Sequence, residues 1–508
     1  MKSMIIDAKD TVGVALTDLA AGDLHEGARL IDDIPQGHKF ALADINEGEQ
    51  IIKYGCPIGR AACDIQAGAH VHVHNIRTNL KDIINYKYEP TARHVATGAD
   101  PTVEGDGNRP ASAPTIDHFM GYPRGDGVFG TRNEIWIIPT VGCVNKTAEK
   151  LAAIGRRRYA QTYAFTHPYG CSQLGEDQTR TQMLLANLVM HPNAGGVLVV
   201  GLGCENNNID EFKHVLARQY AGCERMFGGR VRFLTTQNCA DELAEGAALL
   251  DALAASTEPQ ARVPAPLSSL CIGLKCGGSD GLSGISANPI AGAVADRIIG
   301  AGGAAIITEV PEMFGAEHLL MNRCANEILF AKTVELINSF KKYYLDHGCE
   351  IYENPSPGNK AGGISTLEDK SLGCTQKGGG SPVRAVLRYG GTVCEKGLNL
   401  LEGPGNDLVA VTSLACAGAQ LILFTTGRGT PVGGPVPTLK ISSNTRLAVG
   451  KPGWIDFDAG RLVSGTGFGA LAAELFEMTV ALASGESVAK NEQNDYREIS
   501  LFKDGVIM

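Results

Sequence analysis

Several features that mark common classes of protein are missing from this chain of 508 residues. It has no block of basic residues and its net charge is −10, which argues against nucleic acid as the main partner. No stretch reaches about 18 uncharged apolar residues, so we expect no membrane-spanning helix and no membrane partner. The first residues lack the apolar core of a secretion signal. We therefore expect a cytoplasmic protein whose 14 cysteines stay reduced.

Signature motifs of several enzyme classes are also missing. There is no P-loop, and no glycine-rich run has the spacing of a dinucleotide-binding turn, which disfavours ATP and NAD. The chain has no His-Glu-x-x-His zinc helix and no Gly-x-Ser-x-Gly nucleophile turn, which disfavours the hydrolases built on these motifs. Glycine is abundant by contrast. Its 63 residues cluster at turns and predict many tight loops close to a ligand.

The length of the chain predicts roughly two to four domains. Short β-prone runs separated by turns fill residues 1–88 and predict a small β domain. Residues 89–114 have no periodicity and are expected to form a linker. Strand-like and helix-like runs alternate in residues 115–258 and again in residues 267–508, so each unit is expected to be an α/β domain with a helix-covered parallel sheet. The expected strands of the last unit include residues 408–410.

Four strand-like runs end in a cysteine beside glycine and then continue into polar residues. These cysteines are Cys143, Cys171, Cys204 and Cys276. If the strands are parallel, their ends lie along one edge, where open α/β sheets bind ligands. Thiolates are soft ligands that suit iron, including an iron–sulfur cluster. The alternative is that the four are small buried thiols, because free cysteine is among the most buried residue types.

A second candidate metal site lies in the β-rich first unit. Residues 70–74 alternate histidine and valine, which predicts a strand with all three histidines on one face. His72 and His74, with a carboxylate, would suit mononuclear Fe(II) or Mn(II). An exposed polar face on an edge strand would give the same pattern. The sequence leaves the thiolate and histidine models open.

The motifs of this chain closely resemble those of the altronate/galactarate dehydratase family. The similar segments are residues 37–42, 72–75, 140–145, 167–175, 201–207 and 276–284, and the resemblance continues to the carboxyl end. It implies an α/β protein with a small N-terminal β-clip domain of the SAF type, followed by two α/β domains, the last Rossmann-like. It also implies dehydration of an aldonate or aldarate in hexuronate breakdown, stimulated by iron(II) or manganese(II).

Within the family, residues 72–75 and 201–207 are more similar to the altronate branch than to the galactarate branch. A sulfolactate lyase of the same superfamily is an alternative, although that activity is usually divided between two chains. A sugar-acid-binding regulator is a non-enzymatic alternative, but the sequence has no DNA-binding helix-turn-helix. The expected partner is a small sugar acid, and a homo-oligomer is left open.

Dehydration of a 2,3-dihydroxy acid removes the C2 proton and expels the C3 hydroxyl. This chemistry needs a base, a cation at the carboxylate and an acid at the leaving hydroxyl, and a divalent metal can supply the last two. His38 and Lys39 are the candidate acid/base residues. The candidate substrate-binding residues are Ser279, Asp280, Asn359, Lys360 and Arg428, of which the last two would clamp the carboxylate.

Overall fold

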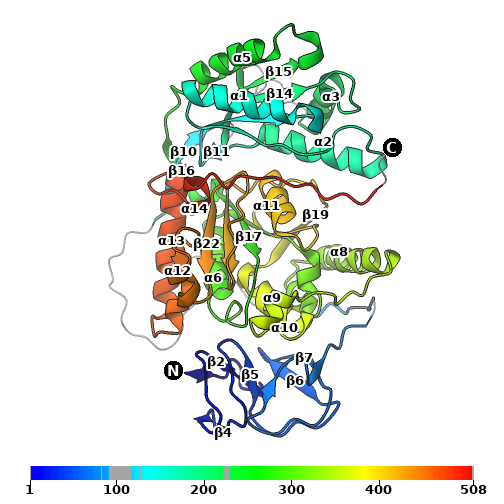
Figure 1. Ribbon diagram of the computed structural model, residues 1–508, viewed down its shortest axis with the longest axis vertical. Coiled ribbons are helices and arrows are strands. Elements are labelled where there is room, and N and C mark those ends of the chain that lie inside the picture. Colours follow the sequence, from blue (N-terminus) through cyan, green and yellow to red (C-terminus); the bar gives the residue numbers. More distant parts are fainter. Residues whose placement is uncertain (1, 82, 91–115, 126, 221–228, 506–508) are drawn as a thin grey trace.

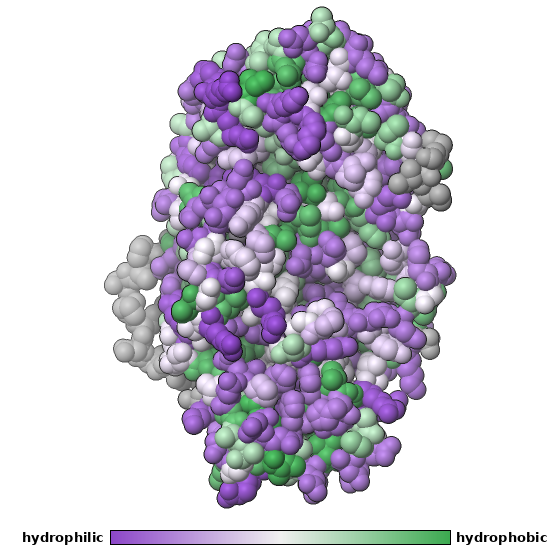
Figure 2. Space-filling view, viewed as in Figure 1, coloured by the Kyte–Doolittle hydropathy of each residue, from purple (hydrophilic) through white to green (hydrophobic). Residues whose placement is uncertain are grey.

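The computed structural model describes residues 2–81, 83–90, 116–125, 127–220 and 229–505, so most of the expected linker 89–114 lies outside the described residues. Three bodies are stacked along the long axis of the molecule (Figure 1). An N-terminal β domain lies at one end, a C-terminal α/β domain in the middle, and a second α/β domain at the other end. On the face drawn in Figure 2, apolar residues are scattered among hydrophilic ones. No helix of the described chain is both long and apolar enough to cross a membrane.

The N-terminal domain is built from short antiparallel strands. One sheet has the order β1 (Ser3–Met4), β2 (Val12–Ala15), β5 (Lys39–Ala41) and β8 (His70–Val71); a second contains β6 (Gln50–Lys53), β7 (Cys56–Ala61) and β9 (Ile76–Arg77); and β3 (Leu24–His25) pairs with β4 (Ala28–Arg29). The expected strand 70–74 was wrong beyond Val71. The Asn75 side chain accepts a hydrogen bond from the His72 amide at 2.9 Å, and this local bond turns the chain out of the strand.

The second domain confirms the expected alternation of strands and helices. Its parallel sheet has the order β13 (Thr162–Ala164), β12 (Glu134–Pro139), β14 (Ala194–Gly201) and β15 (Val231–Thr235). Its helices are α1 (Asn145–Arg158), α2 (Gly175–Met190), α3 (Ile209–Gln219) and α5 (Glu242–Thr257). Strand β14 is buried along its whole length, as expected for a central strand with helices on both faces.

The C-terminal domain contains a seven-stranded parallel sheet. Its order is β19 (Val383–Leu387), β20 (Gly397–Leu401), β18 (Ala304–Ile307), β17 (Cys271–Cys276), β21 (Leu421–Thr426), β22 (Thr438–Ser442) and β23 (Phe457–Asp458). Strand β17 lies between β18 and β21. Later strands are therefore added to the sheet on both sides of β17, and the direction of strand addition reverses there. Open α/β sheets bind their ligands at such a reversal, outside the carboxyl ends of the strands.

The helices of this domain cover the sheet. They are α6 (Ala287–Gly300), α7 (Glu317–Met321), α8 (Glu327–Asp346), α9 (Pro357–Ala361), α10 (Leu367–Thr375), α11 (Asp407–Cys416), α12 (Thr445–Gly450), α13 (Phe468–Ser484) and α14 (Lys490–Gln493). The strand expected at residues 408–410 was wrong, because these residues lie in α11. The Asn406 side chain caps this helix by accepting from the Val409 amide at 3.1 Å. Helix α11 is buried on nearly all sides, and such an apolar run has no helical periodicity to distinguish it from a strand.

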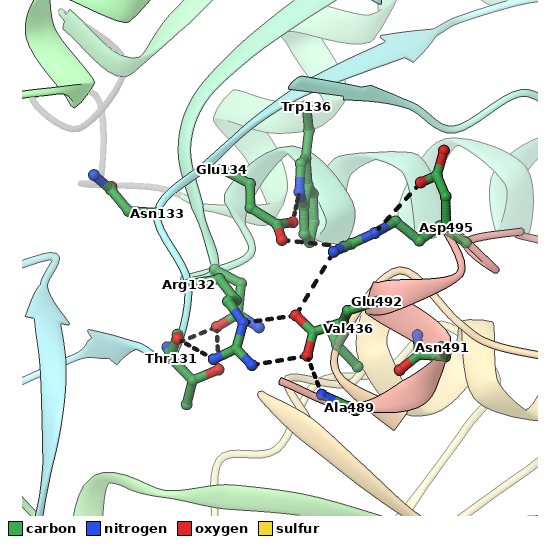
Figure 3. A network of polar contacts seen from close by, with 12 residues as sticks. Thr131, Arg132, Asn133, Glu134, Trp136, Val436, Ala489, Asn491, Glu492 and Asp495 are labelled. Atoms are coloured by element: carbon green, nitrogen blue, oxygen red, sulfur yellow. Dashed lines mark hydrogen bonds and ion pairs between the residues drawn. The ribbon is translucent and has the colours of Figure 1, made fainter. Parts of the chain in front are cut away.

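The second and C-terminal domains are joined by strands and by buried ion pairs. Strand β10 (His118–Pro123) pairs with β11 (Phe129–Gly130) and with β16 (Val263–Pro266). Figure 3 shows the Arg132 guanidinium bound through two nitrogens to Glu492 of α14, at 2.7 and 2.8 Å. Arg497 pairs with Glu134 at 3.0 Å. Because these side chains are buried and matched in charge, they fix the second domain on the C-terminal domain.

Candidate active site

Close contacts between glycines dock the N-terminal domain on the loops at the carboxyl edge of the C-terminal sheet. A Cβ atom added at Gly281 would lie 1.9 Å from the Gly37 oxygen, and one added at Gly363 would lie 2.3 Å from the same atom. Such an approach is open only to residues without a side chain. It places His38 and Lys39, which follow Gly37, in the contact between the two domains.

A cluster of three histidines lies at this contact. His38, His70 and His72 each offer a ligand atom, and the three atoms lie within 4.8 Å of one another. The His38 Nδ1 atom is 2.9 Å from His70 Nε2, and His72 Nδ1 is 3.1 Å from the Ser365 hydroxyl. Burial lowers the pKa of His70 to about 4 and that of His72 to about 3. Both imidazoles are therefore neutral at neutral pH, which is the form that binds metal.

The cluster differs from the pair expected from the sequence. The ring of His74 lies 5.6 Å from the ring of His70, and His74 is not part of the cluster. The sequence predicts only His72 and His74 as histidine ligands, although the alternation of residues 70–74 also places His70 on that face, and it predicts an acid/base role for His38. The third ligand atom comes from His38, which directly precedes β5, and β5 and β8 are hydrogen-bonded neighbours.

One carboxylate next to the histidines holds two buried lysines. The Asp369 side chain lies 2.8 Å from Lys39 Nζ and 3.0 Å from Lys53 Nζ, and Lys39 also donates to the Gly363 oxygen at 2.7 Å. Burial lowers the pKa of Lys39 to about 8, although Asp369 opposes this shift. Burial would raise the pKa of Asp369, but the two ammonium groups hold it well below its usual range. The sequence gave no indication of Asp369 or Lys53, which lie far from Lys39 in the chain.

The five expected substrate-binding residues lie on neighbouring loops and on the short helix α9, at the reversal point of the sheet. The Arg428 amide donates to the Gly278 oxygen at 2.8 Å, and the Asn359 side-chain amide donates to the Ser279 oxygen at 2.8 Å. Asp280 accepts from the Ser443 hydroxyl at 2.7 Å. Lys360 lies on α9 next to Asn359. The structure thus brings together loops that are widely separated in the sequence.

A small cavity of about 10 Å³ lies between these loops and the N-terminal domain. Its lining includes Lys53, Ser279, Asp280, Asp369 and Cys374. The Ser279 hydroxyl is buried, and it has no hydrogen-bond partner among the described residues. A cavity of this size holds about one water molecule. A larger ligand can enter only if the N-terminal domain and the loops move apart.

Cys276 belongs to a buried charged cluster beside this cavity. Its sulfur lies 2.9 Å from Lys377 Nζ, 3.1 Å from a Glu312 oxygen and 3.2 Å from the sulfur of Cys374. The hydrogen bond with Cys374 outweighs burial and lowers the pKa of Cys276 to about 7. Cys276, Glu312 and Cys374 form the second group of the described residues whose ligand atoms lie within 4.8 Å of one another.

The expectation that four cysteines share one sheet edge was therefore wrong for Cys276. Strand β17 belongs to the seven-stranded sheet, whereas β12, β13 and β14 belong to the four-stranded sheet. Cys143, Cys171 and Cys204 follow the latter strands and are exposed. They lie in the second domain, at the opposite end of the molecule from the N-terminal domain with its histidines (Figure 1).

Comparison with known proteins identifies the class to which this fold and site belong. Three family models match consecutive parts of the chain: "Altronate/galactarate dehydratase SAF domain" over residues 1–79, "D-galactarate dehydratase/Altronate hydrolase, second domain" over residues 121–258, and "D-galactarate/Altronate dehydratase, C-terminal" over residues 267–507. The chain belongs to the altronate/galactarate dehydratase family. The predicted α/β fold with an N-terminal SAF domain is confirmed.

Individual relatives match over the full length of the chain. Altronate dehydratase of Escherichia coli (strain K12) is 48% identical over 522 residues, and altronate dehydratase of Bacillus subtilis (strain 168) is 49% identical over 520 residues. Both alignments cover 100% of this chain and 100% of the relative. Galactarate dehydratase (L-threo-forming) of Escherichia coli (strain K12) is 30% identical, covering 95% of this chain and 93% of the relative. These relatives are dehydratases, a class of hydro-lyase.

Proposed function

We propose that this protein is a hydro-lyase that converts D-altronate to 2-dehydro-3-deoxy-D-gluconate and water. The observation that carries the proposal is the match, over the whole chain, to two altronate dehydratases at 48% and 49% identity. The galactarate dehydratase is more distant, at 30% identity. The groups between the N-terminal and C-terminal domains support it, because they combine candidate metal ligands, a buried amine and side chains able to bind a sugar acid.

The histidine cluster fits a resident divalent metal ion. Three neutral imidazoles with ligand atoms within 4.8 Å of one another are suited to Fe(II), with Mn(II) as the second candidate. His38, His70 and His72 would hold the ion. When bound, it would supply a Lewis acid for the carboxylate and for the departing C3 hydroxyl.

We assign the removal of the C2 proton to Lys39. Its amine is completely buried and is held by Asp369 at 2.8 Å and by the Gly363 oxygen at 2.7 Å. A pKa of about 8 leaves part of the lysine population neutral near physiological pH, as a general base requires. Lys53 shares the same carboxylate and so disfavours a second positive charge at Lys39.

The substrate would be bound by groups that lack protein partners. The Ser279 hydroxyl lines the cavity without a described hydrogen-bond partner, so it is free to bind a substrate hydroxyl. Among the described residues, Lys360 and Arg428 form no ion pair, and they would bind the carboxylate. Asp280 and Asn359 are engaged in hydrogen bonds between loops. Their role is to hold Ser279 in place.

The test is a panel of aldonates and aldarates incubated anaerobically with purified protein and Fe(II). We expect D-altronate to yield a 2-keto-3-deoxy acid without added nucleotide, and the Lys39→Met variant to be inactive. Lys9→Met, an exposed lysine of the same domain, is the matched control and should keep full activity. Turnover of galactarate but not of altronate would overturn the substrate assignment.

A further inference from the structure

Three exposed cysteines lie on loops at one edge of the second domain, far from the groups assigned to the dehydration. Each follows a glycine in the loop that leaves the carboxyl end of a parallel strand: Cys143 after β12, Cys171 after β13 and Cys204 after β14. These three strands are direct neighbours in the order β13, β12, β14. Free cysteine is normally one of the most buried residue types. Three exposed thiols on adjacent loops therefore need an explanation other than packing.

Backbone contacts lock the three loops together. The Gly142 amide donates to the Tyr169 oxygen at 2.8 Å, and the Asn207 amide donates to the Gly170 oxygen at 3.1 Å. The Asn207 side chain donates to the Thr140 oxygen at 3.1 Å. A Cβ added at Gly170 would lie 1.9 Å from that same Thr140 oxygen, so the approach of two loops depends on glycine. Cys143 and Cys171 each follow one of these hydrogen-bonded glycines, so the protein fixes their positions without a ligand.

Polar groups lie beside two of the three sulfurs. Gln237 donates to the Cys204 sulfur at 3.5 Å, and the Cys171 sulfur is 3.8 Å from the Ser172 hydroxyl and 3.9 Å from the Asn206 oxygen. Ser172 has a φ of +60°, a left-handed conformation that costs energy for a residue other than glycine. Hydrogen bonds to cysteine sulfur are a principal means of tuning iron–sulfur centres.

The nearby carboxylate is directed away from ligand binding. Glu205 follows Cys204 directly, but its side chain accepts from the Leu202 amide at 2.9 Å, the Gly203 amide at 2.5 Å and the Thr140 hydroxyl at 2.8 Å. It is buried and holds the loop rather than facing the thiols. Within the described part of the chain, Glu205 is therefore not available as a ligand beside the thiols, and thiols favour soft metal centres.

We propose that Cys143, Cys171 and Cys204 bind an iron–sulfur cluster through three thiolates, leaving one iron without a protein ligand. A single tetrahedral metal ion with metal–sulfur bonds of about 2.3 Å would draw its sulfurs to within about 3.8 Å of one another. These three sulfurs, all within the described chain, do not form a group within 4.8 Å. A single ion bound by all three sulfurs would therefore require the loops to move closer together, whereas the inorganic core of a cluster is larger than one ion. The position without a protein ligand is open to water or to an oxygen of a small acid.

The full-length chain would be reconstituted anaerobically with Fe(II), sulfide and a thiol reductant, and desalted. We expect acid-labile sulfide, with iron equal to the sulfide plus any ion held by the histidine cluster, and visible charge-transfer absorption. Cys143→Ser, Cys171→Ser and Cys204→Ser should each lose most of the sulfide and absorption, because a hydroxyl is a poor ligand for a soft centre. Cys349→Ser and Cys394→Ser alter exposed thiols elsewhere and should retain both. The far-ultraviolet circular dichroism of each variant should match that of the parent.

Two results would overturn the proposal. One is the absence of acid-labile sulfide from the reconstituted parent, and the other is a full sulfide content in all three serine variants. The proposal stands apart from the dehydratase assignment. A His70→Ala variant should keep its sulfide whatever happens to altronate turnover, because the histidine cluster and the three thiols lie in different domains.

Discussion

Replacing Asp369 by Asn should weaken the docking of the N-terminal domain more than any other single change at the histidine-bearing contact. The substitution keeps the size of the side chain and removes the one negative charge between Lys39 and Lys53, at 2.8 and 3.0 Å. All three groups are buried. Removing one partner of a buried ion pair costs about 3–5 kcal/mol, because a charge remains buried without compensation. We expect a loss of this size for Asp369→Asn.

Lys53→Met is the matched control, because it removes a positive charge from the cluster whereas Asp369→Asn removes the negative charge. It leaves Lys39 and Asp369 as a neutral pair and removes only one charge-assisted hydrogen bond, worth about 1.5–3 kcal/mol. The charge count therefore predicts that Lys53→Met is the milder variant. A steric explanation of the cluster predicts the reverse order, because Lys→Met removes more atoms than Asp→Asn.

The assay is hydrogen exchange of the amides in β5 and β6, read as the free energy of local opening. Global unfolding is a poor measure here, because a chain with several domains does not unfold in two states. Opening free energies in Asp369→Asn that stay within about 1 kcal/mol of the parent would refute the reasoning, given the expected cost. So would a larger loss in Lys53→Met than in Asp369→Asn.

The pH dependence of the opening free energy provides an independent test of the role of Asp369. The folded-state pKa of Asp369 is depressed by the two ammonium groups. Its contribution is therefore fully present above the unfolded value of about 3.9 and is lost as the pH falls below it towards the folded value. We expect the parent to lose opening free energy at acid pH while Asp369→Asn lacks this component. The two profiles should converge as the pH falls.

Three further predictions concern the proposed active site. Removing metal with a chelator should abolish dehydration, and adding Fe(II) should restore the activity of the parent but not that of His70→Ala. Activity and bound iron would be measured on the same samples, and full activity of metal-free protein would contradict this prediction. Ser279→Ala should lower kcat by on the order of tenfold without lowering the Tm, because the hydroxyl has no described partner to lose; an unchanged kcat would remove Ser279 from the site. Arg428→Ala should raise KM by roughly tenfold to a hundredfold, the value of one charge-assisted bond, whereas Arg446→Ala, on the nearby α12, should not.

Much of the fold could be predicted from local patterns. The apolar run of β14 and the helices that follow its neighbours indicated a parallel sheet, and the structure confirms it. The failures have local causes. Residues 408–410 were assigned to a strand because an apolar run buried on all sides carries no helical period. The strand at residues 70–74 was extended too far, because the capping of the His72 amide by Asn75 interrupts an otherwise regular alternation.

The sequence by itself determined which loops carry polar and metal-binding side chains, because glycine, cysteine and histidine at strand ends are visible in a short window. Only the tertiary structure decided which of these side chains meet. Lys39 and Asp369 are separated by 330 positions, and nothing in either neighbourhood encodes the other. Likewise, Cys276 lies apart from the other three cysteines because its strand belongs to a different sheet. The periodicity of a sequence shows which residues share one face of a helix or strand. The site also depends on how the domains dock, and docking is determined by packing between distant parts of the chain.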